Sequence, residues 1–470
     1  MFDLSSEEIT SKPLTRVLVI LSVPLLGQNL VEVASLVIDL FWIGRLSEGA
    51  VSAVGLAFPL VSLLLLACIG VPYIGTMILV SQRTGAEDEK GAQRATFNGA
   101  VLGAILGLVF GIGAYLSAPQ LVEFIMITQP NPPSEVADLT VAYFRIIALG
   151  MCIAAVSDAL EAAFIARGDS RAALNISVAT VGMIMIADPV LIFGLGPVPA
   201  LGVEGAALAT VLGYATGLGL AAYYAATGRS GGILSRDAFD LQVDLFRELF
   251  DNGFSPAAQM ANRRVADVLI VLVVFAAGGA PALAAYLVGT RIFSIASVPA
   301  DTVQTATQTV VGQNLGADQP GRASMTAWLS ALLICTLLAL AALGQWMLAE
   351  PITRAFAPEL DGAAFELAVD FLQILALSYP AFGVLYALQG GFNGASRGEV
   401  SFRASVVHYW VLQLPLAVGA GLYMGGGATA VFWAITLSNV LTGVGLAVYY
   451  YYVQQSGMFR TAAEEAGAAV

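Results

Sequence analysis

Long apolar stretches alternate with short polar joints along the whole chain. Most of the stretches exceed the ~18 residues that an α-helix needs to cross a hydrocarbon core of about 30 Å. Gly and Pro interrupt many of them, as membrane helices tolerate when neighbouring helices satisfy the freed backbone groups. The pattern predicts an all-α membrane protein with twelve transmembrane helices, at about 15–41, 51–81, 93–117, 137–166, 173–195, 203–227, 250–277, 280–311, 323–348, 366–393, 402–423 and 427–453.

The longest joint divides the chain in two. It contains the segment LQVDLFRELF, whose pattern is typical of an amphipathic helix at a membrane surface. We therefore expect an N-terminal six-helix lobe (1–227), a cytoplasmic linker (228–249) and a C-terminal six-helix lobe with a short cytoplasmic tail (250–470). Arginine and lysine concentrate in the joints of one side, which predicts a multi-pass protein of the cell membrane with both termini in the cytoplasm.

The two halves repeat each other. The segment SQRTGAE matches GQNLGAD in the second half. Other matches, at offsets of 232 and 226, pair Pro24 with Pro256, GDSR (168–171) with GASR (394–397), and Pro189 with Pro415. Repeats of six helices share their orientation in the membrane, so an axis along the membrane normal should relate them. We expect two pseudo-symmetric bundles around a central cleft, the architecture of an alternating-access transporter.

Composition agrees with this class of protein. The 470 residues are 58% hydrophobic and 11% charged, against roughly 25% charged residues in soluble domains. Three cysteines and one histidine offer neither a disulfide framework nor a metal site. We expect no cofactor, no nucleic-acid partner and no enzymatic activity, with the lipid bilayer as the surroundings of a monomer. The net charge of −13 and the scarcity of lysine are typical of a high-salt cytoplasm and suggest a haloarchaeal source.

One polar stripe marks the first apolar segment. Gln28, Glu32, Ser35 and Asp39 lie at i, i+4, i+7 and i+11, so they share one face of a helix that is otherwise apolar. Acids inside a membrane are costly, by about 2.5–3.5 kcal/mol or more, and usually mark ion or proton pathways. Pro24, one turn earlier, weakens the helix and permits a bend. Asp39 is therefore expected to change its charge or to hold a cation.

The repeat helps to separate function from structure at two acids. Asp39 matches Val271, and Asp188 matches Leu414, so the other half builds the same fold with aliphatic residues. A cation-coupling function is favoured for both acids over a structural one. We expect Asp158 to face inward as well.

Other polar positions are less specific. Glu161 lies near the inner end, where solvent can reach it, and Thr210 can either face inward or bond its own helix backbone. Arg263, Arg264 and Asp267 have helical spacing, and mutual neutralisation is favoured over contact with substrate. His408 is expected to be a hydrogen-bonded helix residue.

The motifs together resemble the multidrug and toxic compound extrusion (MATE) family of transporters. The resemblance rests on a first segment with P…D ending in IG and on AVSAVGL, ADPVLIFG, GVEGAALAT and VVGQNLGA, and it runs through nearly all twelve segments. It implies two six-helix lobes that export cationic and amphipathic drugs in exchange for protons or sodium. The branch similar to damage-inducible protein F keeps its essential acids in the first and fifth helices, which correspond to Asp39 and Asp188.

The resemblance also implies roles for further residues. Protonation of Asp39 would accompany bending at Pro24, and Asp158 and Thr210 would occupy polar positions of the same lobe. A sodium site would use Asp39, Asp188 and Thr210. The family usually has Asn one turn before the fifth-helix acid, where this chain has Ile184. Loss of that amide oxygen removes a sodium ligand, so protons are favoured over sodium.

Two alternatives stay open. A flippase for lipids or lipid-linked sugars would share the architecture, but its cleft should be strongly basic, and this chain offers only Arg263, Arg264 and Arg291 there. An intramembrane aspartyl enzyme could use Asp39 and Asp188 as a dyad, although nothing else in the chain supplies a nucleophile with its base.

Overall fold

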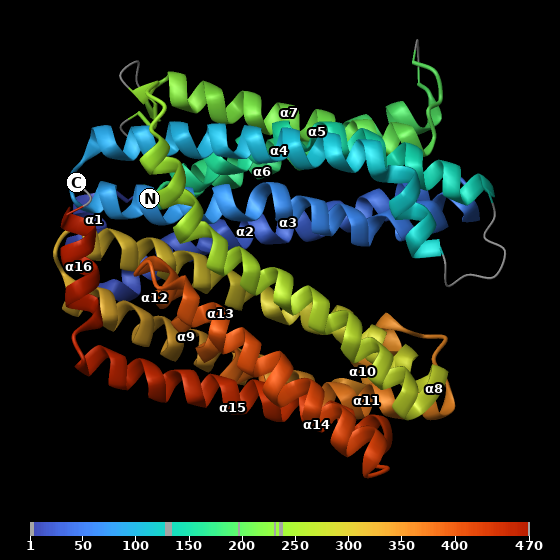
Figure 1. The fold of residues 1–470 in the computed structure, drawn as a ribbon. Coiled ribbons are helices and arrows are strands. Elements are labelled where there is room, and N and C mark those ends of the chain that lie inside the picture. Colours follow the sequence, from blue (N-terminus) through green and yellow to red (C-terminus); the bar gives the residue numbers. More distant parts are fainter. Residues whose placement is uncertain (1–3, 127–133, 196–197, 230–231, 235–237, 469–470) are drawn as a thin grey trace. The chain divides into compact units, whose positions relative to one another are not determined.

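The computed structural model describes residues 4–126, 134–195, 198–229, 232–234 and 238–468, which fold into helices and contain no β-strand (Figure 1). The first helices are α1 (Ser6–Ser11), α2 (Leu14–Ile43), α3 (Glu48–Gly85), α4 (Glu89–Met126), α5 (Ser134–Ala166), α6 (Ser170–Phe193) and α7 (Val203–Ala226). The later helices are α8 (Val243–Gly316), α9 (Pro320–Met347), α10 (Ala349–Phe356), α11 (Gly362–Ala376), α12 (Tyr379–Gly394), α13 (Gly398–Val406), α14 (Leu414–Val418), α15 (Gly427–Gln455) and α16 (Met458–Ala468).

Ten of the described helices are long and apolar enough to cross a membrane, or eleven stretches if α11 and α12, which meet at a bend of 51°, form one span. The span that follows α12 is compound, because π-helical stretches at Val407–Gln413 and Gly419–Tyr423 flank α14. Helix α8 has 74 residues, about 110 Å of helix, and Gly279 interrupts it with non-helical φ and ψ. The predicted segments 250–277 and 280–311 lie on either side of this glycine. The total of twelve spans in two bundles stays a prediction.

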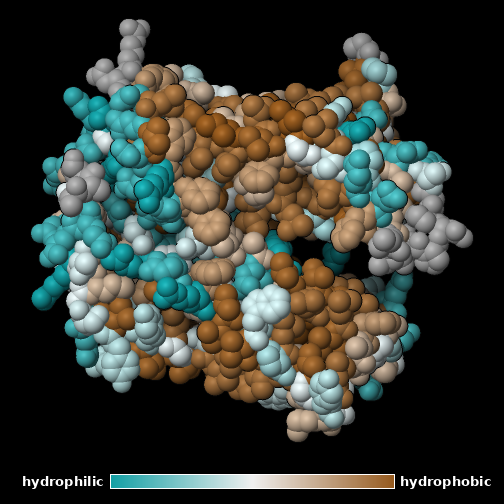
Figure 2. Space-filling view, viewed as in Figure 1, coloured by the Kyte–Doolittle hydropathy of each residue, from teal (hydrophilic) through white to brown (hydrophobic). Residues whose placement is uncertain are grey.

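The surface supports a membrane location for these helices. Large apolar side chains are exposed along them, including Leu108 (54%), Ile186 (68%) and Leu340 (66%). Figure 2 shows apolar residues over the middle of the long helices and hydrophilic residues gathered near α1 and α16. Exposed apolar surface on this scale is expected of helices whose outer face contacts lipid.

The described helices form two compact units. The first contains Met1–Ser11 and Val19–Ala257, and the second contains Lys12–Leu18 and Ala258–Ala469. Inside the expected linker of 228–249, the helix begins at Val243 and continues as α8, so LQVDLFRELF opens a long helix and does not form a separate one.

Small residues let α4 and α5 approach closely in the first unit. Gly103, Gly107 and Gly111 recur every four residues along α4, and a methyl group on any of them would lie within 2.8 Å of an α5 backbone atom. This is the small-residue pattern by which membrane helices pack without a hydrophobic driving force. Helix α5 also packs against α3, α6 and α7, so it holds a central place among the helices of its unit.

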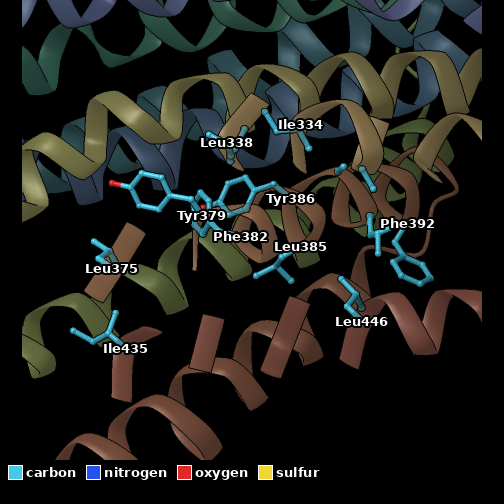
Figure 3. Packing of buried hydrophobic residues seen from close by; sticks show 14 of the residues in the cluster. Ile334, Leu338, Leu375, Tyr379, Phe382, Leu385, Tyr386, Phe392, Ile435 and Leu446 are labelled. Carbon is cyan, nitrogen blue, oxygen red and sulfur yellow. The ribbon is translucent and has the colours of Figure 1, made fainter. Parts of the chain in front are cut away.

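Aromatic residues fill the core of the second unit. Figure 3 shows Ile334 and Leu338 of α9 beside Phe382 and Tyr386 of α12. Helix α12 packs against both α9 and α15. The Phe382 and Tyr386 rings lie 4.3 Å apart, which fixes the position of the Tyr386 hydroxyl used by the polar cluster described below.

Four helix ends show the repeat in the backbone itself. After each of α3, α5, α8 and α12, a residue with positive φ and the residue that follows it each donate one backbone hydrogen bond to the last turn, the Schellman arrangement. These four residues are Glu87, Gly168, Asp318 and Ser396. Glu87 matches Asp318 at an offset of 231, but Gly168 matches Ser396 at 228. The predicted offset of 226 for the second pair was therefore wrong by two residues, because it aligned GDSR with GASR by letters and not by the turn.

Candidate functional site

The carboxyl groups of Asp39 and Asp188 meet inside the first unit. Asp39 lies on α2 and Asp188 on α6, and their carboxyl groups lie close enough to interact with each other. Asp188 is buried, with 1% of its surface exposed, whereas Asp39 is half-buried. Two carboxyl groups can share a hydrogen bond only if one of them carries a proton. The fold therefore brings together two acids that lie 149 positions apart in the sequence, as a pair that can share one proton.

No cation neutralises this pair among the described residues. Neither acid forms a salt bridge there, and the groups that act electrostatically on them include the partner acid and two tyrosines, Tyr143 of α5 and Tyr214 of α7. One oxygen of each acid, Oδ1 of Asp39 and Oδ2 of Asp188, is buried without a hydrogen-bond partner. Unpaired buried oxygens of this kind are costly unless a proton or a cation occupies them.

The predicted stripe on α2 faces α5 and α6 of the same unit. Nε2 of Gln28 donates to Oε1 of Glu161 at 2.6 Å and to Oε1 of Glu32 at 3.3 Å. Ser177 of α6 hydrogen-bonds the same Glu161 carboxyl group. Gln28 is 7% exposed and Glu161 is 6% exposed. The interpretation of Glu161 as a solvated residue was therefore wrong, because α2 and α6 cover it.

The remaining predicted residues have less specific surroundings. Ser35 is buried on the striped face, and Asp158 is half-buried and lies near Glu32. Pro24 is buried inside α2. The Thr210 hydroxyl donates to the Ala206 carbonyl oxygen at 3.1 Å, so of the two alternatives the structure shows the bond to its own helix.

Ile184, at the position where the resembled family usually has Asn, lies in apolar surroundings. Ile184 lies one turn before Asp188 on α6 and is 5% exposed. Its side chain packs where Gly213 of α7 leaves room, since a methyl group on Gly213 would lie 2.5 Å from Ile184 Cγ1. Within the described part of the chain, no three His, Cys, Asp or Glu side chains are arranged to hold a metal ion.

Three tyrosines near the acids were not predicted from the sequence. Tyr143 is near Asp39 and Asp188, Tyr73 is near the Glu161 group, and Tyr214 is near both sets of acids. They lie on α5, α3 and α7, inside apolar runs whose spacing does not distinguish a hydroxyl that faces acids from one that faces lipid. Only the packing of the helices identifies them.

A separate polar cluster lies in the second unit. Arg263 on α8 donates to the Tyr386 hydroxyl and lies 4.0 Å from Asp267, which confirms the predicted i, i+4 pairing. Arg264 and Arg291 are exposed. His408 is buried and hydrogen-bonds Thr442 at 2.9 Å, as predicted for a helix histidine. Tyr386 thus connects the aromatic core of this unit to its arginine.

Comparison with known proteins defines the class. The MatE family model matches residues 24–190 and 259–418, one stretch in each half and more than half of the chain together. The protein belongs to the MatE family, a family of membrane transporters and not of enzymes. The earlier assignment to this family is confirmed.

Individual relatives are similar over almost the whole chain. The FAD transporter of Shewanella oneidensis is 25% identical over 446 residues, covering 94% of this chain and 95% of that protein. The probable multidrug resistance protein NorM of Deinococcus radiodurans is 27% identical over 432 residues, covering 88% and 90%. A solved MOP superfamily transporter from Pyrococcus furiosus has the same fold, with a TM-score of 0.88 at 20% identity, covering 97% and 99%.

Proposed function

We propose that the protein is a secondary active efflux transporter that exports cationic and amphipathic compounds by cation antiport. Relatives named as multidrug resistance proteins support the cargo class. One observation carries the coupling mechanism: the carboxyl groups of Asp39 and Asp188 lie next to each other and can share one proton, with no arginine or lysine beside them in the described structure. The assignment to the damage-inducible protein F branch belongs to this proposal and rests on the same two acids.

The proton is the favoured coupling ion. Sodium prefers several oxygen ligands, and the position that would add an amide oxygen next to Asp188 is Ile184. The Thr210 hydroxyl donates its hydrogen within α7 and keeps lone pairs, so it offers one oxygen ligand. A proton needs only a carboxylate oxygen, and Asp39 and Asp188 each have one buried oxygen without a partner.

Bending of α2 would connect the proton to transport. Pro24 has no N–H, so the Ile20 carbonyl oxygen has no helical partner four residues later. Gln28 and Asp39 follow on the same helix, and each interacts with a side chain of a neighbouring helix. When Asp39 gains or loses its proton, its interaction with Asp188 changes, and Pro24 is the weakest point at which α2 can respond.

The test uses proteoliposomes loaded with ethidium. An imposed pH gradient should drive ethidium movement in the wild type, and Asp39→Asn and Asp188→Asn should abolish that dependence because Asn cannot exchange a proton. Asp138→Asn, an exposed acid on α5, is the control and should transport normally. Ethidium movement that follows a sodium gradient and ignores the pH gradient would reject proton coupling.

A second candidate is export of a flavin nucleotide. Its support is the similarity to the FAD transporter of Shewanella oneidensis and the presence of Arg263 and Arg264 in the second unit. A phosphate-bearing anion would suit arginine and not the acidic first unit. FAD replaces ethidium in the same vesicles: gradient-driven FAD movement without ethidium movement would favour this alternative.

A further inference from the structure

A second polar group lies between α2 and α5. It consists of the amide Gln28 and the acid Glu32 on α2 with the acids Asp158 and Glu161 on α5, and we call it the Gln28 cluster. Gln28 Nε2 bridges two carboxyl groups, at 2.6 Å to Glu161 and 3.3 Å to Glu32. Gln28 precedes Asp39 by eleven residues, about 16 Å along α2. The Gln28 cluster and the Asp39–Asp188 pair are therefore separate centres.

The groups that interact with Glu161 come from several helices and are all polar. They are Gln28 and Glu32 of α2, Tyr73 of α3, Asp158 of α5 and Ser177 of α6, and Tyr214 of α7 interacts with Glu32 and Asp158. No arginine or lysine of the described chain is among them. Ionising the buried Glu161 beside Glu32 and Asp158 is unfavourable without compensation, because each carboxylate would be a like charge to the others.

Protons can supply that compensation. A protonated carboxyl group becomes a hydrogen-bond donor and needs an acceptor close by.

The acceptor is present. Oε1 of Gln28 is buried and has no hydrogen-bond partner, although Nε2 of the same amide is engaged by two acids. Gln28 is 7% exposed, so water does not satisfy this oxygen freely. A buried, unpaired carbonyl oxygen beside carboxyl groups is placed to accept from a protonated acid. Glu32 is exposed, and an exposed acid on an otherwise apolar helix is stable only beside water, which gives the cluster a path for proton exchange.

We propose that the Gln28 cluster is a second proton-loading site, with Glu161 as its carrier, so that each transport cycle moves two protons. This inference rests on the proposed function, because the cycle in which the second proton takes part is cation export. The first proton binds at the Asp39–Asp188 pair. The second proton binds a Glu161 carboxylate oxygen on loading and leaves from the same oxygen on release. Gln28 Nε2 donates to the ionised carboxylate, and Gln28 Oε1 accepts from the protonated carboxyl group.

The number of protons can be read from a balance of gradients. Proteoliposomes with the membrane potential clamped at zero receive a pH gradient and opposing ethidium gradients, and the ethidium ratio at which net flux vanishes is measured. Each coupled proton supplies about 1.4 kcal/mol per pH unit, a factor of ten. Two protons therefore balance an ethidium ratio of about one hundred per pH unit, and one proton balances about ten.

The wild type should balance near the hundredfold ratio. Glu161→Gln, which keeps the shape but cannot ionise, should balance near tenfold, Glu161→Asp should restore the higher ratio, and Glu135→Gln, an exposed acid on α5, should match the wild type. A tenfold ratio in the wild type would overturn the second site whatever the variants do, and would leave the proposed function intact. Hundredfold ratios in both wild type and Glu161→Gln would overturn the assignment to Glu161, and a balance set by sodium would overturn its protonic nature. Absence of all gradient-driven ethidium movement would overturn the proposed function together with this proposal.

Discussion

The close approach of α4 to α5 leads to a prediction with a magnitude. Gly107→Ala would place a methyl group 2.7 Å from Cys152 Cα and 2.8 Å from the Met151 carbonyl oxygen. Carbon atoms normally rest about 3.5–4.0 Å apart, so the helices must separate by roughly 1 Å. A gap of that size forfeits up to about half of each affected dispersion contact. Overpacking of this kind costs about 1–3 kcal/mol.

Gly113→Ala is the matched control. Gly113 lies on the same helix, is exposed, and a methyl group there meets nothing within 4 Å. Both variants gain the same backbone rigidity, so the difference between them isolates the overlap with α5. Thermal unfolding of the purified protein in detergent should give a lower midpoint for Gly107→Ala than for Gly113→Ala.

Ethidium transport should also depend on the contact between α4 and α5. Helix α5 carries Tyr143, Asp158 and Glu161, so displacement by Gly107→Ala should also slow ethidium transport, whereas Gly113→Ala should not. Equal midpoints for the two variants would refute the reasoning, because they would show that α4 and α5 do not touch at Gly107.

Three further outcomes are expected. Asp39→Asn should still bind ethidium, but its transport should ignore the pH gradient; transport that keeps its pH dependence would contradict the role of this acid. Pro24→Ala restores a backbone hydrogen bond that bending must break, about 1 kcal/mol, so turnover limited by bending should fall roughly fivefold; an unchanged rate would exclude bending there. Ile184→Asn adds an amide oxygen one turn before Asp188, so a sodium gradient should drive ethidium transport in this variant and not in the wild type; identical sodium responses would remove the explanation of ion preference.

Hydropathy predicted the helices well because span length and apolar content are local properties. The segments expected at 93–117 and 173–195 lie within α4 and α6 except at their ends. The bend of 51° between α11 and α12 and the π-helical stretch at Val407–Gln413 were not foreseen. Both depend on how neighbouring helices satisfy backbone groups, which no window of sequence reports.

The spacing of residues predicted which side chains share a face of α2, but it did not predict their partners on other helices. The helical period put Gln28, Glu32 and Asp39 on one face, and the structure places all three toward acids of neighbouring helices. The partners of these residues could not be predicted, because Glu161 is 133 positions from Gln28 and contacts it only when α5 packs on α2. For the same reason Glu161 was interpreted as a solvated end residue, and its place beside an unpaired amide oxygen was missed.

In the proposed mechanism, Asp39 and Asp188 hold one exchangeable proton between them. Infrared difference spectroscopy measures this directly, because a protonated carboxyl group absorbs apart from a carboxylate. The wild type should show a protonated-carboxyl band that titrates over the pH range of transport and that both Asp39→Asn and Asp188→Asn remove. Spectra in which both acids are ionised throughout that range would contradict the account.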